Sequence, residues 1–393
     1  MRNKTYIWLT VGISLLVLTS AATAQDEQWL QYHSEREAAR IVGDMRTMSL
    51  KLLSERPEGV ESPDFKCDKP FFAAWSTPMV DSGKIWLALD RTNDKWDRLF
   101  IDSNVNGHIN DENTITPYRT EQYSAYFGPV KVVFEGEDGP LTYHLNLRFY
   151  ENGPTRRLYV SSGSWYEGDI TVAGAKKHCV LIDYNANGTF NDKSLDSSKC
   201  DRIRIGKKTD GDACFVGNYI EVDGTLYRTE IARDGAYIVL AKAEDVKYGN
   251  IRLPETITEF SAGGENGLFE PKLEKGAGSL PVGKYRINNW TSERKDEKGK
   301  KWTLRGRYFS DKGDLDVTEA TETSLEIGEP VTANLQVTLN GETEAYEFDK
   351  ILRGQLGEYV SLTSGGRDVS NLWKMQGKNK EGTFAKTYPI PDQ

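Results

Sequence analysis

The stretch "RLFIDSNVNGHIND", residues 98–111, recurs as "CVLIDYNANGTFND", residues 179–192. In both copies an apolar run leads into a loop with one Asp, two alternating Asn and a glycine. The loops start 81 residues apart, since 183 minus 102 is 81. Duplication of one β unit is the simplest explanation, because two copies are too few for a solenoid.

Short runs rich in β-branched and aromatic residues surround both loops, and Asp-Gly pairs separate several of them. Alternation of apolar and polar residues predicts strands at Lys84–Leu89, Pro129–Phe134, Leu141–Phe149 and Arg157–Val160, followed by a meander from Asn218 to Ala241. We therefore expect a mainly β protein in which residues 59–253 form a duplicated β region.

A second β region is predicted beyond Pro254, where the sequence becomes rich in Gly and Glu. Turn signals then recur roughly every 8–12 residues, which is typical of a β-sandwich. Residues 254–393 are thus expected to form one or two β-sandwich modules of immunoglobulin-like architecture. The segment "LPVGKYRI", residues 280–287, resembles a strand pair of exported transthyretin-like and immunoglobulin-like modules.

The segment before these regions, residues 25–58, predicts an N-terminal amphipathic helix. Apolar residues recur at steps of mostly three and four, with Glu and Arg between them; they are Trp29, Leu30, Ala38, Ile41, Val42, Met45, Met48 and Leu52. Pro57 and Gly59 end the pattern.

Residues 1–24 have the pattern of a secretory signal peptide. Arg2 and Lys4 precede 13 mostly apolar residues, Tyr6–Leu18, and an A-x-A sequence ends at Ala24. The alternative is a membrane anchor, but this run is shorter than the roughly 20 residues that span a bilayer. We expect a protein exported to the periplasm or the cell exterior, with no transmembrane segment after signal cleavage.

The charge and cysteine content narrow the classes of partner. The formal net charge of −9 and the pI near 5.3 argue against nucleic-acid binding, so an unknown protein or polysaccharide is the expected partner. In an exported protein the four cysteines permit disulfides, and a Cys179–Cys200 bridge across the second loop is one possibility. Buried thiols are the other. No Cys/His cluster suggests zinc.

The two loops carry the candidate metal ligands. Ca²⁺ takes six to eight oxygens, and side chains at positions 1, 3 and 5 converge when a glycine at position 6 permits a sharp turn. The carbonyl of position 7 adds an oxygen. The predicted ligands are Asp102, Asn104, Asn106, His108 and Asp111 in the first loop, and Asp183, Asn185, Asn187, Thr189 and Asp192 in the second.

Both loops resemble the calcium loops of EF-hand and dockerin proteins through position 8, although strands rather than helices precede them. The resemblance implies a bidentate Glu at position 12, where this chain has Asn113 and Ser194. An acid or amide at position 9 or 10 is the expected substitute: Asn110 or Asp111, and Asn191 or Asp192. We expect weak, structural Ca²⁺ binding, with a Kd of about 10⁻⁴ to 10⁻³ M. The alternative is a pair of Asx-turns without metal.

No catalytic motif such as GxSxG, HExxH or a P-loop is present. The whole pattern resembles secreted bacterial proteins that combine EF-hand-like loops with immunoglobulin-like domains. The first hypothesis is a non-enzymatic, calcium-binding structural or adhesion-type protein. The alternatives are a carbohydrate-binding protein and a hydrolase whose site cannot be recognised in one sequence.

Overall fold

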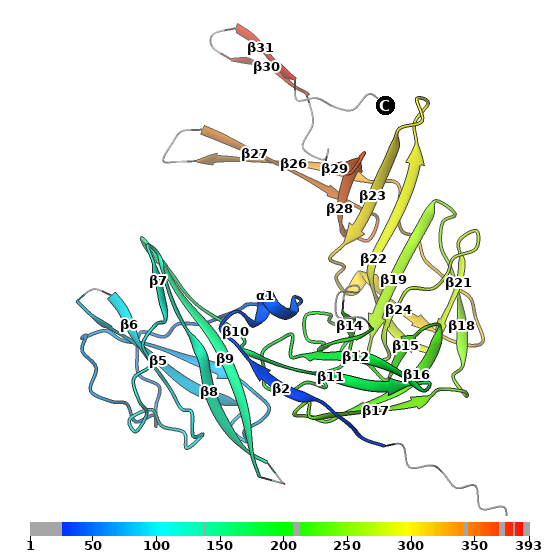
Figure 1. Cartoon of the computed structure of the whole chain (residues 1–393). Helices are drawn as coiled ribbons and strands as arrows, with labels where there is room; N and C mark the ends of the chain where they lie inside the picture. Colours follow the sequence, from blue (N-terminus) through cyan, green and yellow to red (C-terminus); the bar gives the residue numbers. More distant parts are fainter. Residues whose placement is uncertain are drawn as a thin grey trace, which may run out of the picture.

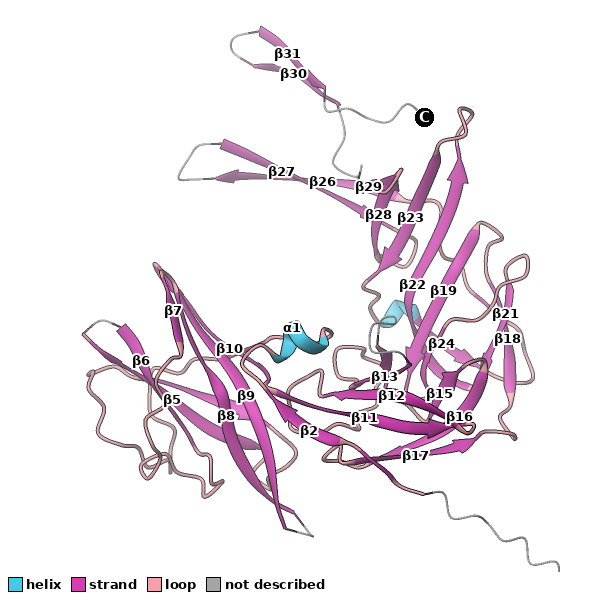
Figure 2. Cartoon of the chain, viewed as in Figure 1, coloured by secondary structure: helices cyan, strands magenta, loops and turns pink. Residues whose placement is uncertain are grey.

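The computed structural model describes residues 26–93, 95–136, 139–206, 213–340, 345–368, 374–379 and 382–387. These residues form a mainly β structure with several sheets and two short helical segments (Figures 1 and 2). The predicted signal peptide, residues 1–24, lies outside the described residues. None of the described helices is long and apolar enough to span a membrane.

Two sheets form the region around the first loop. A three-stranded antiparallel sheet contains β4 (Phe71–Ser76), β5 (Lys84–Thr92) and β6 (Lys95–Ile101). A five-stranded sheet has the order β3 (Met48–Leu50), β10 (Thr155–Ser162), β9 (Gly139–Asn152), β8 (Ser124–Gly136) and β7 (Arg119–Glu121). The strands predicted in this region are therefore confirmed, with longer bounds.

Two further sheets form the region around the second loop. One has the order β14 (Cys214–Phe215), β13 (Arg202–Gly206), β12 (Ala175–Ile182), β11 (Ser164–Val172) and β2 (Gln31–Ser34). The other has the order β1 (Gln28–Trp29), β17 (Tyr237–Lys242), β16 (Thr225–Ile231) and β15 (Tyr219–Val222). The last three strands are the predicted meander.

The C-terminal region is built on a long sheet. Its strands are β20 (Gly267–Phe269), β19 (Ile257–Gly264), β22 (Gly283–Lys295), β23 (Lys301–Arg307), β28 (Tyr359–Ser364), β27 (Ala345–Arg353) and β26 (Thr332–Asn340), with β24 (Asp314–Val317) on β22 and β29 (Arg367–Asp368) on β28. Next to it in sequence are a small sheet of β21 (Ala277–Pro281), β18 (Tyr248–Arg252) and β25 (Thr323–Ser324), the 3₁₀ turn η1 (Asp311–Gly313), and the hairpin β30 (Lys374–Asn379) with β31 (Gly382–Thr387). The stretch 280–287 contains the end of β21 and the start of β22, so it is two strands that belong to different sheets.

The prediction of a helix across residues 25–58 is wrong. Only α1 (Ala38–Val42) is helical, and it ends at Gly43 and Asp44, which both have positive φ. The flanking residues instead form β1, β2 and β3, which pair with the edges of β17, β11 and β10. Sheet edges offer unpaired N–H and C=O groups, and pairing with them overrides the helical periodicity of this segment, since tertiary context routinely overrides intrinsic propensity.

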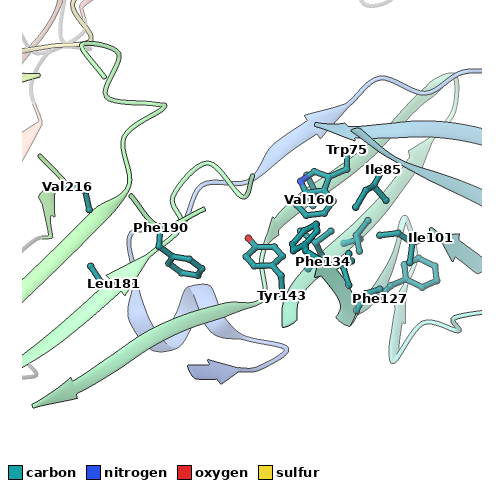
Figure 3. Packing of buried hydrophobic residues seen from close by; sticks show 14 of the residues in the cluster. Trp75, Ile85, Ile101, Phe127, Phe134, Tyr143, Val160, Leu181, Phe190 and Val216 are labelled. Carbon is teal, nitrogen blue, oxygen red and sulfur yellow. The ribbon is translucent and has the colours of Figure 1, made fainter. Parts of the chain in front are cut away.

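Most of the buried apolar side chains fall into two clusters. The larger spans residues 30–238 and joins the sheets around both loops, as shown by Trp75, Phe134 and Tyr143 beside Phe190 (Figure 3). The second spans residues 226–360 and includes Trp290, which is fully buried. The regions around the two loops therefore share one core.

Candidate metal centres

Each loop begins where a buried strand ends. The first follows β6 and the second follows β12, and each of these strands is the second member of an antiparallel hairpin. Asp102 and Asp183 at position 1 are 2% and 0% exposed. The apolar strand thus carries a carboxylate into the protein interior, which requires compensating hydrogen bonds.

The position-1 carboxylates receive the same pair of backbone hydrogen bonds. Asp102 accepts the N–H of Asn106 at 3.0 Å and that of Gly107 at 2.9 Å. Asp183 accepts the N–H of Asn187 at 3.3 Å and that of Gly188 at 2.8 Å. The loops therefore curl around the first carboxylate in the same way.

The backbone dihedral angles agree with this equivalence. Position 4 has a positive φ in both loops, 63° at Val105 and 51° at Ala186, and the glycine at position 6 has φ of 89° and 96°. A positive φ is uncommon for a residue other than glycine and is an outlier for a β-branched one. The two loops thus follow one backbone path despite their different side chains.

The amides at positions 3 and 5 converge on the acid at position 10. In the first loop the Nδ2 atoms of Asn104 and Asn106 lie 3.1 and 2.8 Å from Oδ2 of Asp111. In the second, the corresponding distances from Asn185 and Asn187 to Oδ2 of Asp192 are 2.9 and 2.6 Å.

The side chains at position 9 do not contact the amides at positions 3 and 5: Asn110 donates to Glu61, and Asn191 donates to the carbonyl of Ile231. Of the two positions left open by the sequence, position 10 is the one that faces positions 3 and 5.

The side chains at position 7 have other partners. Nδ1 of His108 accepts the N–H of Glu61 at 3.3 Å, and Oγ1 of Thr189 donates to Oδ1 of Asn187 at 2.8 Å. Only the carbonyls of His108 and Thr189 were predicted as ligands, so these contacts leave that prediction open.

A further acid beside each loop was not among the predicted ligands. Glu112 accepts the N–H of Ser103 at 2.6 Å, and Asp201 accepts the N–H groups of Tyr184 at 3.1 Å and Asp192 at 2.8 Å. Asp201 lies 18 residues beyond Asp183 because 201 minus 183 is 18. The pairing of Ile182 with Arg202 in the β12–β13 hairpin brings these two acids opposite each other. A correct hairpin register would have been the signal for Asp201.

The second loop concentrates negative charge in the interior. Burial is the largest cause that raises the pKa of Asp183 to about 7, against hydrogen bonds from Tyr143 and Gly188 that lower it. Burial, followed by the charges of Asp183 and Asp192, raises the pKa of Asp201 well above its usual value. Like charges in a low-dielectric site disfavour simultaneous ionisation.

The first loop is more open to water. Burial raises the pKa of Asp102, whereas the hydrogen bond from Asn104 is the main cause that lowers the pKa of the exposed Asp111. Two loops of similar backbone therefore differ in how much charge they hold away from solvent.

The described residues contain no group of three or more His, Cys, Asp or Glu side chains arranged to hold a metal ion. A metal in either loop would therefore need amide and carbonyl oxygens beside the carboxylates. All four cysteines are free thiols, and the Sγ of Cys200 donates to the carbonyl of Ser194 at 2.9 Å. Of the two possibilities left open by the sequence, the structure contains buried or half-buried thiols and no Cys179–Cys200 bridge.

Comparison with known proteins gives no match: no family model, no curated protein and no solved structure matches the chain.

Proposed function

We propose that this chain is an exported, non-enzymatic β protein of structural or adhesion type, in which two Asp/Asn loops bind Ca²⁺. The export rests on the signal-peptide pattern of residues 1–24 and the immunoglobulin-like β-sandwich on the strand and turn spacing of residues 254–393. The calcium sites rest on the geometry of the loops.

The observation that carries the proposal is the buried acidic group of the second loop. Asp183 and Asp201 are fully buried, and the half-buried Asp192 lies close enough to influence both. Among the described residues their hydrogen-bond donors are backbone N–H groups, two Asn amides and the hydroxyl of Tyr143, and none is a cationic side chain. Buried charges are normally paired or coordinate a metal, and a divalent cation would supply the missing positive charge.

The donor set of this loop fits Ca²⁺. Oδ1 of Asp183 accepts one hydrogen bond, from Asn187, so a lone pair remains. Oδ1 of Asp192 accepts none from a described residue. Oδ1 of Asn187 already accepts two hydrogen bonds from Thr189, so the remaining oxygens are those of Asn185 and the carbonyl of Thr189, and this set consists only of hard oxygen ligands.

An ion bound here would hold the two loop regions together. The hydroxyl of Tyr143 on β9 donates to Asp183 at 2.7 Å, and the indole N–H of Trp75 on β4 donates to the carbonyl of Ala186 at 2.6 Å. Figure 3 shows Trp75 and Tyr143 on one side of the core and Phe190, at position 8 of the loop, facing Tyr143. Fixing the second loop would thus fix the packing of β4 and β9 against it.

The direct test is a calcium titration by calorimetry on the EDTA-treated mature chain. We expect two weak sites, with Kd values of about 10⁻⁴ to 10⁻³ M. Asp192→Asn keeps the acceptor for both amides but removes the charge, and it should abolish the second site. Asp111→Asn should do the same for the first. Asp196→Asn is the matched control: it lies in the same segment as the second loop, and among the described residues its side chain accepts a hydrogen bond from Ser198 alone. Absence of heat up to about ten millimolar, well above the expected range, would reduce both loops to Asx-turns.

A further inference from the structure

A large cleft lies between the exit of the second loop and the C-terminal sheet. Its volume is about 820 Å³, within the size range of small-molecule binding sites. Tyr184 and Phe215 contribute to one side, and strands β19, β22 and β23 form the other. The ring of Phe215 packs directly on the backbone of Gly263, where a side chain would have no room, and this contact fixes the two sides together.

The cleft is cationic in a protein of net charge −9. Its lining includes only two acids, Glu259 and Glu270, against five cations. The five are Arg202, Lys272, Arg286, Arg305 and Arg307. A concave surface lined by one sign of charge focuses its field and concentrates ligands of the opposite sign.

Most of these cations have no close carboxylate. Within the described part of the chain Arg307 and Lys272 make no ion pair, and the nearest carboxylate to Arg305 is Glu259, at 3.7 Å. Arg202 donates to the carbonyls of Ser197 and Cys200. Arg286 is already paired with Asp314, through Nε at 2.5 Å and Nη2 at 3.0 Å. Arg307, and Arg305 beyond its contact with Glu259, are therefore the guanidinium groups of the lining that can receive an anion, and guanidinium forms bidentate hydrogen bonds with carboxylates.

Aromatic rings lie at both ends of this cationic surface. The guanidinium of Arg202 lies 3.8 Å from the ring centroid of Tyr184 and 4.3 Å from that of Phe215, so it is fixed between two rings. At the other end Tyr308 is 79% exposed and has a φ of 60°. A bulky residue in that backbone region is strained, and such strain often marks a binding site. It presents a flat ring to solvent at the rim of the cleft.

The remaining polar groups fit hydroxyls better than a peptide. Asn288, Asn289, Thr258 and Ser197 line the cleft with amides and hydroxyls. An extended peptide would need a free strand edge. Arg305 and Arg307 on β23 have hydrogen-bonded neighbours on both sides, and the free edge in the lining is the short part of β19 before Ala262, which pairs with β22 alone. The indoles of Trp165 on β11 and Trp290 on β22 offer no stacking surface for a sugar, because they are 4% and 0% exposed.

We propose that this cleft binds an acidic oligosaccharide, with sugar carboxylates paired to Arg305 and Arg307 and a sugar face stacked on Tyr308. Charge selects the acidic sugar over a neutral one, and the paired edges of β23 leave an extended peptide no strand to join beside Arg305 and Arg307. The proposal goes beyond calcium binding and does not require it.

The test measures binding of the full mature chain to a hexamer of galacturonic acid by calorimetry. The comparison probes are a galactose hexamer of the same length, a glutamate hexapeptide and a single-stranded oligonucleotide. We expect the galacturonate hexamer to bind at least about tenfold more tightly than the others, since charge-assisted bidentate hydrogen bonds supply discrimination of that order. Equal binding of the galactose hexamer, tighter binding of the peptide or oligonucleotide, or no binding at all would overturn the proposal.

Variants locate the site. The double variant Arg305→Gln with Arg307→Gln should weaken binding about tenfold or more. The single variant Arg307→Lys should keep only part of the wild-type affinity, because Lys cannot form the bidentate pair. Tyr308→Ala should weaken binding without changing the preference for the acidic hexamer. Arg228→Gln, an exposed arginine paired with Asp245 outside the cleft lining, is the matched control and should bind normally. Every measurement is made in calcium and in EDTA. Binding should persist in EDTA, because the cleft does not require calcium, and binding absent in EDTA overturns the proposal.

Discussion

The two Asp/Asn loops share a sequence pattern and a backbone path but lie in different surroundings. In the first, Asn104, Asn106 and Asp111 are exposed; in the second, their counterparts Asn185, Asn187 and Asp192 are half-buried. In the first loop His108 and Asn110 form solvent-exposed hydrogen bonds with Glu61. The second is packed between sheets.

Two loops with the same ligand types can therefore contribute differently to the stability of the protein. The first loop holds one buried carboxylate, Asp102, whereas its acid at position 10, Asp111, is exposed and solvated. A buried group of carboxylates carries a desolvation cost that hydrogen bonds only partly offset. We therefore expect calcium to matter more to folding at the second loop, although the two loops offer the same set of ligands.

The largest expected effect is on stability in calcium. Asp183→Ala leaves the N–H groups of Asn187 and Gly188 and the hydroxyl of Tyr143 without their acceptor in a buried site, and it removes the ion. We expect a loss of about 3–5 kcal/mol in the free energy of unfolding, against about 1–2 kcal/mol for Asp102→Ala, because Asp102 is also buried but its loop has no second buried carboxylate. Urea unfolding of both variants measures this. Equal losses would mean that burial does not distinguish the loops.

The next effect is a pH dependence in the absence of calcium. The pKa of Asp183 is raised from 3.8 unfolded to about 7 folded, so the folded state binds more protons between these values. Stability should therefore fall as the pH rises from about 4 to 7, and the contribution of Asp183 should then level off. The raised pKa of Asp201 should continue the fall to higher pH. We expect the free energy of unfolding to fall by about 2–4 kcal/mol between pH 5 and 8.

Asp183→Asn should flatten this profile, and so should saturating calcium in the wild-type chain, because both remove the cost of the buried charge. Asp102→Asn should change it little. Thermal unfolding across the pH range in EDTA gives the profiles. A calcium-free protein whose stability rises from pH 5 to 8 would contradict the charge state assigned to the second loop.

The sequence predicted what is local in these loops. The turns that follow Asp102 and Asp183 are closed by hydrogen bonds between residues at most five positions apart, so the spacing was enough to predict them. Alternation likewise predicted the strands around them. Asp201 was missed because its place depends on the register of β12 against β13, which no short pattern encodes. The helix predicted for residues 25–58 failed for a related reason: the edges that pair with Trp29, Tyr32 and Ser49 belong to strands far along the chain.

A smaller effect isolates the hydrogen bond that Tyr143, on β9, donates to the carboxylate of Asp183 in the second loop. Tyr143→Phe removes the hydroxyl that donates to Asp183. The free energy of unfolding should fall by about 1–2 kcal/mol, and the pKa of Asp183 should rise further. Tyr166→Phe is the matched control, since Tyr166 packs on Phe190 in the same core and its hydroxyl makes no hydrogen bond with a described residue. The two variants should differ in urea unfolding and in the midpoint of the pH profile. Identical behaviour would show that the Tyr143 hydroxyl bond contributes nothing.

The smallest expected effect distinguishes position 9 from position 10. Asn110 and Asn191 point away from the amides at positions 3 and 5, so Asn110→Ala and Asn191→Ala should leave calcium affinity within about twofold. Stability should change by about 0.5 kcal/mol or less at Asn110, which is exposed. Asp111→Asn and Asp192→Asn, one residue later, remove a carboxylate that both amides contact. If calorimetry instead finds calcium lost in the Asn110 or Asn191 variant and kept in its neighbour, the ion is held by position 9. The loop would then have to rotate its amides away from the acid that they contact, and the equivalence of the two loops would hold for the turn but not for the metal.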